Sequence, residues 1–334
     1  MTAKSGNLYA GFDLGGTKIS MSIIDGAGEV IRRDKLKTPA NISSAGGMLV
    51  ANEAIMMLAR SGYLPDISAM TFAVAGYSDK GELYNFEYTI RREFSNVGAL
   101  FFIPDYQIFF HADWRDFTIE EDLAPGGEEE KTIKALIICG TGSIVLASQK
   151  NGPSDNAIHK IFGGGPILSD PGSGFDLGFR FLRKYGIESA LGTLDERVPA
   201  LAEKHGCGDA AAIAREVKPG NPAAVSAIAS FAPLMLEISE TSGCGPYLEE
   251  TLEAAKTLAL GASHIFKNNF KNYIDKPVRI LFNGSVLLRS DFYKNIMKQN
   301  LKKLIGASNM EFFDVSEDVS LICARYSKSA DRGV

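Results

Sequence analysis

The sequence has few cysteines, no long apolar run and no strong excess of charge of one sign. Its four cysteines, Cys139, Cys207, Cys244 and Cys323, are far apart in 334 residues and form no CxxC pair. This spacing argues against structural disulfides and a zinc site, and it favours a reducing cytoplasm. No apolar run is long enough to span a membrane, and no signal-peptide core precedes the first expected strand. We therefore expect a cytoplasmic protein.

The charge balance excludes a further class of partners. The chain has 35 Lys and Arg residues against 40 Asp and Glu, a net charge of −5. Such a balance gives no general attraction to nucleic acid or to an anionic membrane, so we expect neither as a partner. Hydrophobic residues make up 45% and charged residues 22%, as in an ordinary globular protein. At this length two domains are more natural than one core.

A standard P-loop is also absent, although a similar segment is present. A P-loop reads G-x-x-x-x-G-K-[ST] and leads from a strand into a helix. Here Asp13-Leu14-Gly15-Gly16-Thr17-Lys18 is followed by alternating apolar and small polar residues, the period of a strand. Phosphate donors would have to be backbone N–H groups of Gly15 and Gly16 and the Thr17 hydroxyl. Lys18 either adds positive charge near the phosphates or projects into solvent.

A second turn of the same kind occurs later in the chain. Gly140-Thr141-Gly142-Ser143 lies between two apolar strands. Two such turns can face each other across a cleft and hold a polyphosphate, which predicts an ATP-using enzyme. The alternative is a pair of plain hairpins, because glycine-rich turns are ordinary hairpin signals. The match between the two turns, together with Asp13 at a strand end, favours the phosphate interpretation.

The order of expected elements is similar in the two halves of the chain. The first half predicts three strands over 8–36, then a helix over 43–62, a strand over 69–74, a helix near 88–95 and a strand over 106–111. The second half starts with the strand pair around Gly140. It continues with a helix-rich segment over 174–272, a strand over 278–282, a helix over 291–304, a strand over 311–313 and a helix from Ser316. We expect an α/β fold with two mixed-sheet domains.

Four segments resemble one superfamily. The turn at 13–18 looks like the first phosphate loop of the actin–hexokinase–Hsp70 ATPases, Gly140 to Ser143 looks like the second, and 280–286 looks like the adenosine-pocket turn, with Gly284 and Ser285. The segment 163–174 is similar to the glycine-rich segment of amino-sugar kinases. Within the superfamily, the chain resembles the N-acetylglucosamine kinase and BadF/BadG/BcrA/BcrD ATPase branch.

This resemblance implies two ribonuclease H-like domains that flank an interdomain nucleotide cleft. The expected domains are 1–117 and 118–315, the second with a helical insert over 174–272. The C-terminal helix over 316–334 is expected to pack back on the first domain. The implied cofactors are ATP and Mg²⁺, and we also expect a homodimer.

The resemblance places the catalytic base at Asp113. A kinase needs a carboxylate that accepts the hydroxyl proton, and Asp113 follows the expected strand. The family usually has Asn or Thr before this Asp, whereas this chain has Ala112. Asp116, which precedes Phe117-Thr118 as in some bacterial glucokinases, is a competing candidate. A third alternative is that Asp113 only caps the next helix.

Two further carboxylates are implicated by the resemblance. Asp13 would orient a water bound to Mg²⁺, a cation that prefers one or two carboxylates with waters and phosphate oxygens. The alternative is that Asp13 only forms a turn. Asp170 would accept sugar hydroxyls, although Ser-Asp-Pro-Gly-Ser is also a strong turn sequence.

Other substrate contacts are implied at Gly76, Gly165 and Ser173. The chain departs from the family near this site, because Pro171 replaces the usual Glu and Gly164 stands where amino-sugar kinases have Trp. Both departures affect the expected sugar pocket.

These observations predict an ATP-dependent kinase for a sugar hydroxyl. The expected acceptor is an amino sugar or an N-acetylated amino sugar such as glucosamine or N-acetylglucosamine, and another hexose is the alternative. A second alternative is an ATPase activator of a radical dehydratase or reductase, but the cysteines are poorly placed for its iron–sulfur cluster. A third is a sugar sensor, for which the chain has no N-terminal DNA-binding segment.

Overall fold

The computed structural model describes residues 7–16, 18–111, 132–149, 157–205, 222–241, 245–315 and 317–331. The chain divides into two compact units. Unit 1 consists of Met1–Ile119 and Ser316–Val334, and unit 2 consists of Glu120–Val315. Within the described ranges, no helix combines the length and the apolar character that crossing a membrane requires.

Unit 1 contains a mixed five-stranded sheet with the order β3-β2-β1-β4-β5. The first three strands form an antiparallel meander, and β4 and β5 run parallel to β1. The carboxyl ends of β1, β4 and β5 therefore lie at the same edge of the sheet. The strands are β1 (Leu8–Leu14), β2 (Ile19–Ile24), β3 (Val30–Leu36), β4 (Ile67–Val74) and β5 (Ala99–Pro104).

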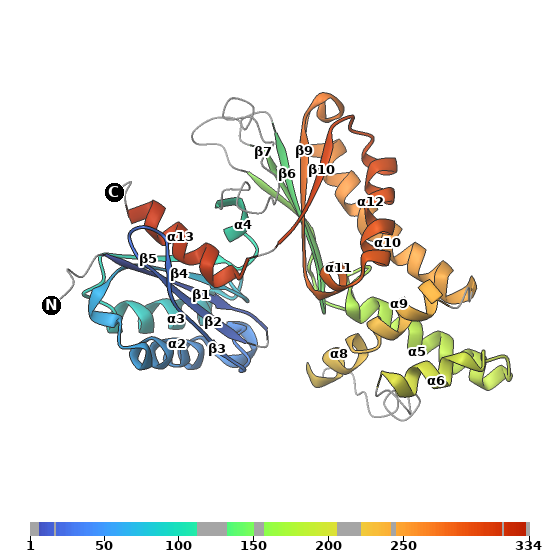
Figure 1. Cartoon of the computed structure of the whole chain (residues 1–334), viewed down its shortest axis with the longest axis horizontal. Coiled ribbons are helices and arrows are strands. Elements are labelled where there is room, and N and C mark those ends of the chain that lie inside the picture. Colours follow the sequence, from blue (N-terminus) through green and yellow to red (C-terminus); the bar gives the residue numbers. More distant parts are fainter. Residues whose placement is uncertain are drawn as a thin grey trace. The chain divides into compact units, whose positions relative to one another are not determined.

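Helices cover both faces of this sheet (Figure 1). Successive residues of a strand point to opposite faces, so Phe12 packs toward α2 and α3 whereas Tyr9 packs toward α13. Gly11 has no room for a side chain, because a Cβ there would collide with the backbone of Ser320 and Ala324. The helices are α1 (Ile42–Ala45), α2 (Gly47–Ser61), η1 (Leu64–Asp66), α3 (Lys80–Glu93), α4 (Ile108–His111) and α13 (Val319–Asp331).

Unit 2 repeats the topology of the unit 1 sheet. Its strand order is β10-β9-β6-β7-β8, again with a three-stranded antiparallel meander followed by two parallel strands. This repetition confirms the expected α/β fold class and the expected duplication of element order. The strands are β6 (Ile133–Cys139), β7 (Ser143–Gln149), β8 (Ile158–Phe162), β9 (Val278–Asn283) and β10 (Met310–Asp314).

The helices of unit 2 share one core with its sheet. Aromatic side chains of α5, α10 and the turn between α8 and α9 meet there: Phe181 stacks on Phe231 and lies 6.0 Å from Tyr247, measured between ring centroids. The helices are α5 (Gly174–Leu191), α6 (Arg197–Lys204), α8 (Pro222–Ala229), α9 (Ala232–Thr241), α10 (Gly245–Asn269), η3 (Tyr273–Asp275), α11 (Ser285–Arg289) and α12 (Asp291–Ile305).

The expected strand over 106–111 is wrong. The strand that pairs with β4 is β5, in the register Ala69 to Ala99, and residues 108–111 form the short helix α4. A short apolar run is compatible with either a strand or a buried helical turn, and here β5 already occupies the position beside β4. The helix expected near 88–95 is α3, which begins at Lys80 because Asp79 caps it and accepts a hydrogen bond from the Glu82 N–H.

Candidate functional site

The turn between β6 and β7 is held by the first residues of α5. Within the turn, the Gly140 N–H donates to the Gly142 carbonyl at 2.9 Å. The N–H groups of Gly174 and Phe175 donate to the carbonyls of Gly140 and Thr141 at 2.7 and 3.1 Å. These bonds point the turn's carbonyls toward α5. They fix the shape of the second expected phosphate turn.

Asp170 lies against the same turn and is only 8% exposed. A Cβ built on Gly142 would approach Asp170 Oδ2 to 2.5 Å. The carboxylate accepts the Gly165 N–H at 3.3 Å, and the backbone N–H groups of Ser143 and Gly163 also bond to it. Burial raises the pKa of Asp170 above its ordinary value, and the three N–H donors oppose this effect. The structure thus brings Asp170 and Gly165 directly to the second turn.

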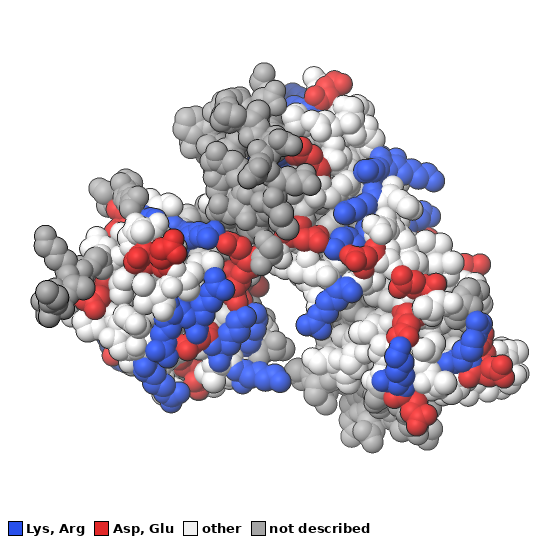
Figure 2. Space-filling view, in the orientation of Figure 1, with Lys and Arg blue, Asp and Glu red and all other residues white. Residues whose placement is uncertain are grey.

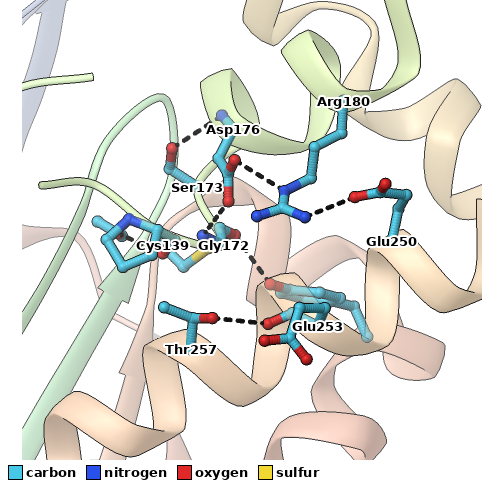
Figure 3. A network of polar contacts seen from close by, with 11 residues as sticks. Cys139, Gly172, Ser173, Asp176, Arg180, Glu250, Glu253 and Thr257 are labelled. Atoms are coloured by element: carbon cyan, nitrogen blue, oxygen red, sulfur yellow. Dashed lines mark hydrogen bonds and ion pairs between the residues drawn. The ribbon is translucent and has the colours of Figure 1, made fainter. Parts of the chain in front are cut away.

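A network of polar contacts fixes the segment that follows Asp170 (Figure 3). The Gly172 carbonyl accepts hydrogen bonds from Cys139 Sγ at 3.0 Å and from Tyr293 Oη at 2.9 Å. The Gly172 N–H donates to Asp176 Oδ2 at 2.8 Å, while Ser173 caps α5 by accepting the Asp176 N–H. Ser173 is fully buried and its hydroxyl is used in this cap. Its observed role is therefore to begin α5.

The expected adenosine turn contacts the second phosphate turn. Gly284 has φ +91°, and a Cβ there would collide with the backbone of Cys139. The Cβ position of Gly140 lies 3.9 Å from both the Gly284 Cα and the Ser285 nitrogen. Only glycine combines this backbone conformation with this close approach. The two segments are more than a hundred residues apart in the sequence.

A pocket of about 750 Å³ opens beside these two turns. Gly140, Thr141, Gly174 and Ser285 form one end of it. Its size is that of a small-molecule site. Its apolar wall comes from α8, α9 and the start of α11 and α12, with Ala229, Ala232, Pro233, Leu236, Val286 and Phe292. The sequence predicted only a helix-rich segment over 174–272 and did not indicate this wall, because helical periodicity does not show what a helix faces.

The rim of the pocket carries charged side chains. Glu237 accepts hydrogen bonds from Lys204 Nζ at 2.7 Å and His205 Nε2 at 2.6 Å, and these bonds lower its pKa. The pocket therefore joins a glycine-rich turn, an apolar wall and a polar rim, which is suited to a ligand with a ring at one end and phosphates at the other.

In unit 1, Asp13 lies at the carboxyl end of β1 and is 8% exposed. Burial, together with the nearby Asp318, raises its pKa to about 6, although Lys18 opposes this effect. The Lys18 Nζ lies 3.7 Å from Asp13 Oδ2. Ser20, the residue opposite Asp13 on β2, has a fully buried hydroxyl that finds no hydrogen-bond partner among the described residues.

These residues fit a hydrated Mg²⁺ ion. Asp13 supplies one carboxylate, and burial raises its pKa more than the nearby Lys18 lowers it. The unpartnered Ser20 hydroxyl on the same face could accept or donate one further hydrogen bond. Mg²⁺ commonly uses few protein carboxylates and keeps several waters.

Gly15 and Gly76 are joined through one segment of unit 1. The Ala40 N–H donates to the Gly15 carbonyl at 3.1 Å, and Ser43 Oγ donates to the Gly76 carbonyl at 3.2 Å. Gly76 has φ +84°, and a Cβ there would lie 2.5 Å from Asn41 Oδ1. The segment 40–43, which the sequence reading did not single out, thus connects the first turn with the end of β4. A Cβ built on Gly16 would meet no atom within 4 Å, so this position lies open.

Several expected site residues lie outside the described residues. They are Thr17, the expected base Asp113 and its competitor Asp116. Residues 108–111 form a helix and not the expected strand, so no strand end precedes Asp113 to support its assignment as the base.

The fold defines the class of this protein. A candidate N-acetylglucosamine kinase of Porphyromonas gingivalis superposes with a TM-score of 0.64 at 15% identity, over 96% of this chain and 99% of that chain. A ROK family glucokinase of Streptomyces griseus, solved with glucose and AMPPNP, gives 0.59 at 16% identity, over 98% and 100%. At such identities the likeness establishes the fold alone, which is that of the actin-like ATPases.

The sequence comparisons define the family. The family model described as the BadF/BadG/BcrA/BcrD ATPase family matches residues 10–311. The protein therefore belongs to the BadF/BadG/BcrA/BcrD ATPase family, as its motifs predicted. An N-acetylmuramic acid/N-acetylglucosamine kinase of Clostridium acetobutylicum is 30% identical over 192 residues, which are 56% of this chain and 54% of that protein. The chain thus spans about half the length of the curated relative that it matches.

Proposed function

We propose that the protein transfers the γ-phosphoryl group of ATP to a hydroxyl of a sugar. One observation carries the proposal: the turn at 140–143 contacts both the 283–285 turn beside a ligand-sized pocket and the buried carboxylate of Asp170. A nucleotide's phosphates and an acceptor's hydroxyl would thus meet at one turn. The curated relative's name supports an amino sugar or N-acetylated amino sugar as acceptor.

The proposed nucleotide-binding residues come from glycine-rich turns in each unit. The backbone N–H groups of Thr141 and Gly142 would donate to phosphates, while Gly140 and Ser143, whose N–H groups bond to the Gly142 carbonyl and to Asp170, would shape the turn. Gly284 and Ser285 would border the adenosine. Gly16 and Thr17 would add donors and Lys18 one positive charge, while Gly15, whose N–H donates to the Lys18 carbonyl at 3.0 Å, would shape the turn. Asp13 would hold waters of Mg²⁺, an ion that neutralises charge on the transferring phosphoryl group.

The acceptor side would use Asp170, Gly165 and Gly76, whereas the fully buried Ser173 would act only by starting α5. Asp170 would accept hydroxyl hydrogens with the lone pairs that its three backbone donors leave free. Asp113 would take the proton of the attacking hydroxyl while the new O–P bond forms and ADP leaves. The products are a sugar phosphate and ADP.

The identity of the acceptor depends on Gly164 and Pro171, the two positions at which this chain departs from amino-sugar kinases. Gly164 donates its N–H to Ser169 Oγ at 2.7 Å, and a Cβ at 164 would collide with that oxygen. A large side chain at this position would require the 164–169 turn to change. Because Gly164 lacks the large side chain that amino-sugar kinases have at this position, a plain hexose is the alternative acceptor, as in a glucokinase.

The activator of a radical dehydratase is a weaker alternative. Cys139 and Cys323 are fully buried in the cores of their units. Burial raises the pKa of both thiols, which disfavours the thiolate that an iron–sulfur cluster requires. Cys207 and Cys244 lie outside the described residues.

An ADP-release assay with Mg-ATP tests the proposal. The panel would contain N-acetylglucosamine, N-acetylmuramic acid, glucosamine and glucose, with phosphorus NMR to identify the product. We expect one N-acetylated amino sugar to stimulate ADP release with formation of a phosphate monoester. ATP hydrolysis that no sugar stimulates, in a protein that binds ATP, would contradict the proposal.

A further inference from the structure

A second concave site of unit 2 is lined by none of the residues assigned above to nucleotide and acceptor. It is a pocket of about 520 Å³ between α5 and α10. Three cationic side chains line it, Arg180, Arg183 and Lys184, and two carboxylates, Asp176 and Glu250. The cations follow one another at helical spacing, so all three can reach the same ligand.

The cations differ in how far they are already neutralised. Arg180 donates to Asp176 Oδ1 at 2.9 Å and to Glu250 Oε2 at 2.6 Å. Lys184 lies 3.8 Å from Glu188. Arg183 forms no ion pair with any described residue, so its guanidinium is available. Figure 2 shows acidic and basic side chains interspersed over the helices of unit 2. The three cations in this pocket are therefore a local cluster and not part of a larger positively charged surface.

The pocket also has an apolar side. Phe179 and Ile187, each 50% exposed, line it one helical turn to either side of Arg183. A guanidinium group binds phosphate oxygens in a bidentate manner. The C–H face of a small carbon skeleton would pack on the phenyl ring. This combination suits a phosphate monoester with a small sugar or polyol attached.

The pocket is connected to the acceptor segment by a short chain of contacts. Figure 3 shows Arg180 reaching from the pocket to Asp176, and Asp176 accepting the Gly172 N–H. Gly172 lies two residues after Asp170. A phosphate bound to Arg180 would compete with Asp176 for the guanidinium. Without its bond to Arg180, the Asp176 carboxylate would no longer be fixed in the orientation in which it accepts the Gly172 N–H. The segment that contains Gly172 and Asp170 would then be less well positioned.

We propose that this pocket binds a phosphate monoester and that the bound ligand weakens acceptor binding through Arg180, Asp176 and Gly172. The binding part stands on the pocket alone. The coupling part rests on the proposed function. Because it applies to any acceptor held by Asp170, it makes a sugar phosphate an inhibitor that binds at a pocket separate from the acceptor.

Calorimetric titration tests the binding part without any turnover. The full-length protein, saturated with Mg-ADP so that its phosphate turns are occupied, is titrated with inorganic phosphate and separately with glucose 6-phosphate. Arg183→Ala should weaken phosphate binding about tenfold, since a charge-assisted bond is lost. Glu250→Gln should tighten it, because a competing carboxylate is removed. Arg60→Ala, an exposed helical arginine of unit 1, is the matched control and should change nothing.

The two probes separate the sources of the phosphate group. Tighter binding of glucose 6-phosphate than of inorganic phosphate, abolished by Phe179→Ala, supports a sugar phosphate. Equal binding of both probes assigns the site to free phosphate. Equal affinity of Arg183→Ala and wild type for both probes overturns the pocket as a phosphate site.

Steady-state kinetics tests the coupling part. Phosphate should raise the acceptor KM in the wild type and in Arg60→Ala, but not in Arg183→Ala, whose activity without phosphate should be unchanged. By linkage, the acceptor should weaken phosphate binding by the same factor. Phosphate binding that leaves the acceptor KM unchanged would overturn the coupling while leaving both the site and the kinase proposal in place.

Discussion

The Cβ position of Gly142 lies 2.5 Å from the Oδ2 atom of Asp170. The turn assigned to the phosphates and the carboxylate assigned to the acceptor are therefore in van der Waals contact, although 28 residues separate them in the sequence. Neither can move without the other, because Asp170 also accepts backbone N–H groups of Ser143 and Gly165. A disturbance at this contact should therefore affect both substrates.

Gly142→Ala tests this contact. The added methyl group would push Asp170 away from its backbone donors, and we expect the KM for both ATP and sugar to rise and kcat/KM to fall at least about tenfold. Overpacking of this kind typically costs about 1–3 kcal/mol of stability. Gly186→Ala is the control, because a Cβ at this helical position meets nothing within 4 Å. A KM that changes for only one substrate would contradict the shared contact.

Gly284→Ala tests the contact between the two nucleotide turns. A Cβ at this position would collide with the Cys139 backbone, and φ is +91°. Gly306 also has a positive φ, +73°, but has open space around it. Gly306→Ala therefore reports the conformational cost alone, about 1 kcal/mol. We expect Gly284→Ala to be more destabilising by at least about 2 kcal/mol in urea unfolding and to lose ATP binding. Equal unfolding curves for the two variants would show that the collision is relieved.

The raised pKa of Asp13 predicts a pH-dependent stability. A carboxyl whose pKa is about 6 in the folded protein and 3.8 in the unfolded chain opposes folding when it is ionised. The cost is fully present above pH 6 and disappears as the pH falls toward 4. Asp13→Asn removes it, so the variant should be more stable than wild type by about 3 kcal/mol at pH 8 and no more stable near pH 4.

The same variant separates stability from function. Asp13→Asn should lose Mg²⁺-dependent phosphorylation although it is the more stable protein at pH 8. Urea unfolding at the two pH values, beside an ADP-release assay, provides both measurements. A variant that is less stable than wild type at pH 8 would show that the Asp13 charge is stabilised in the folded protein.

The assignment of the base can be decided between two carboxylates. Asp113→Asn should leave ATP and sugar binding intact and lower kcat by about 10²–10⁴-fold, the usual contribution of a general base. Asp116→Asn should then retain activity close to wild type. The reverse pattern in the ADP-release assay would move the role to Asp116, and full activity in both variants would exclude the pair.

The local strand–turn–strand units could be predicted because their signals are local. Alternating apolar residues around Gly15-Gly16 and around Gly140 to Gly142 predicted β1–β2 and β6–β7. The prediction of a strand over 106–111 was wrong because the aromatic residues of this segment suit a buried helical turn as well as a strand. Only the pairing of Ala99–Pro104 with β4 decided between them.

Short-range patterns in the amino-acid sequence were enough to predict the family, the duplicated order of elements and the two glycine-rich turns, because these depend on local periodicity and on the backbone freedom of glycine. The contacts of Asp170 with Gly142 and of Gly284 with Cys139, and the pocket wall formed by α8 and α9, emerged only in the folded chain. Such contacts join residues that are distant in the chain. They arise from the packing of helices on a sheet, and no local pattern encodes which side chains that packing brings together.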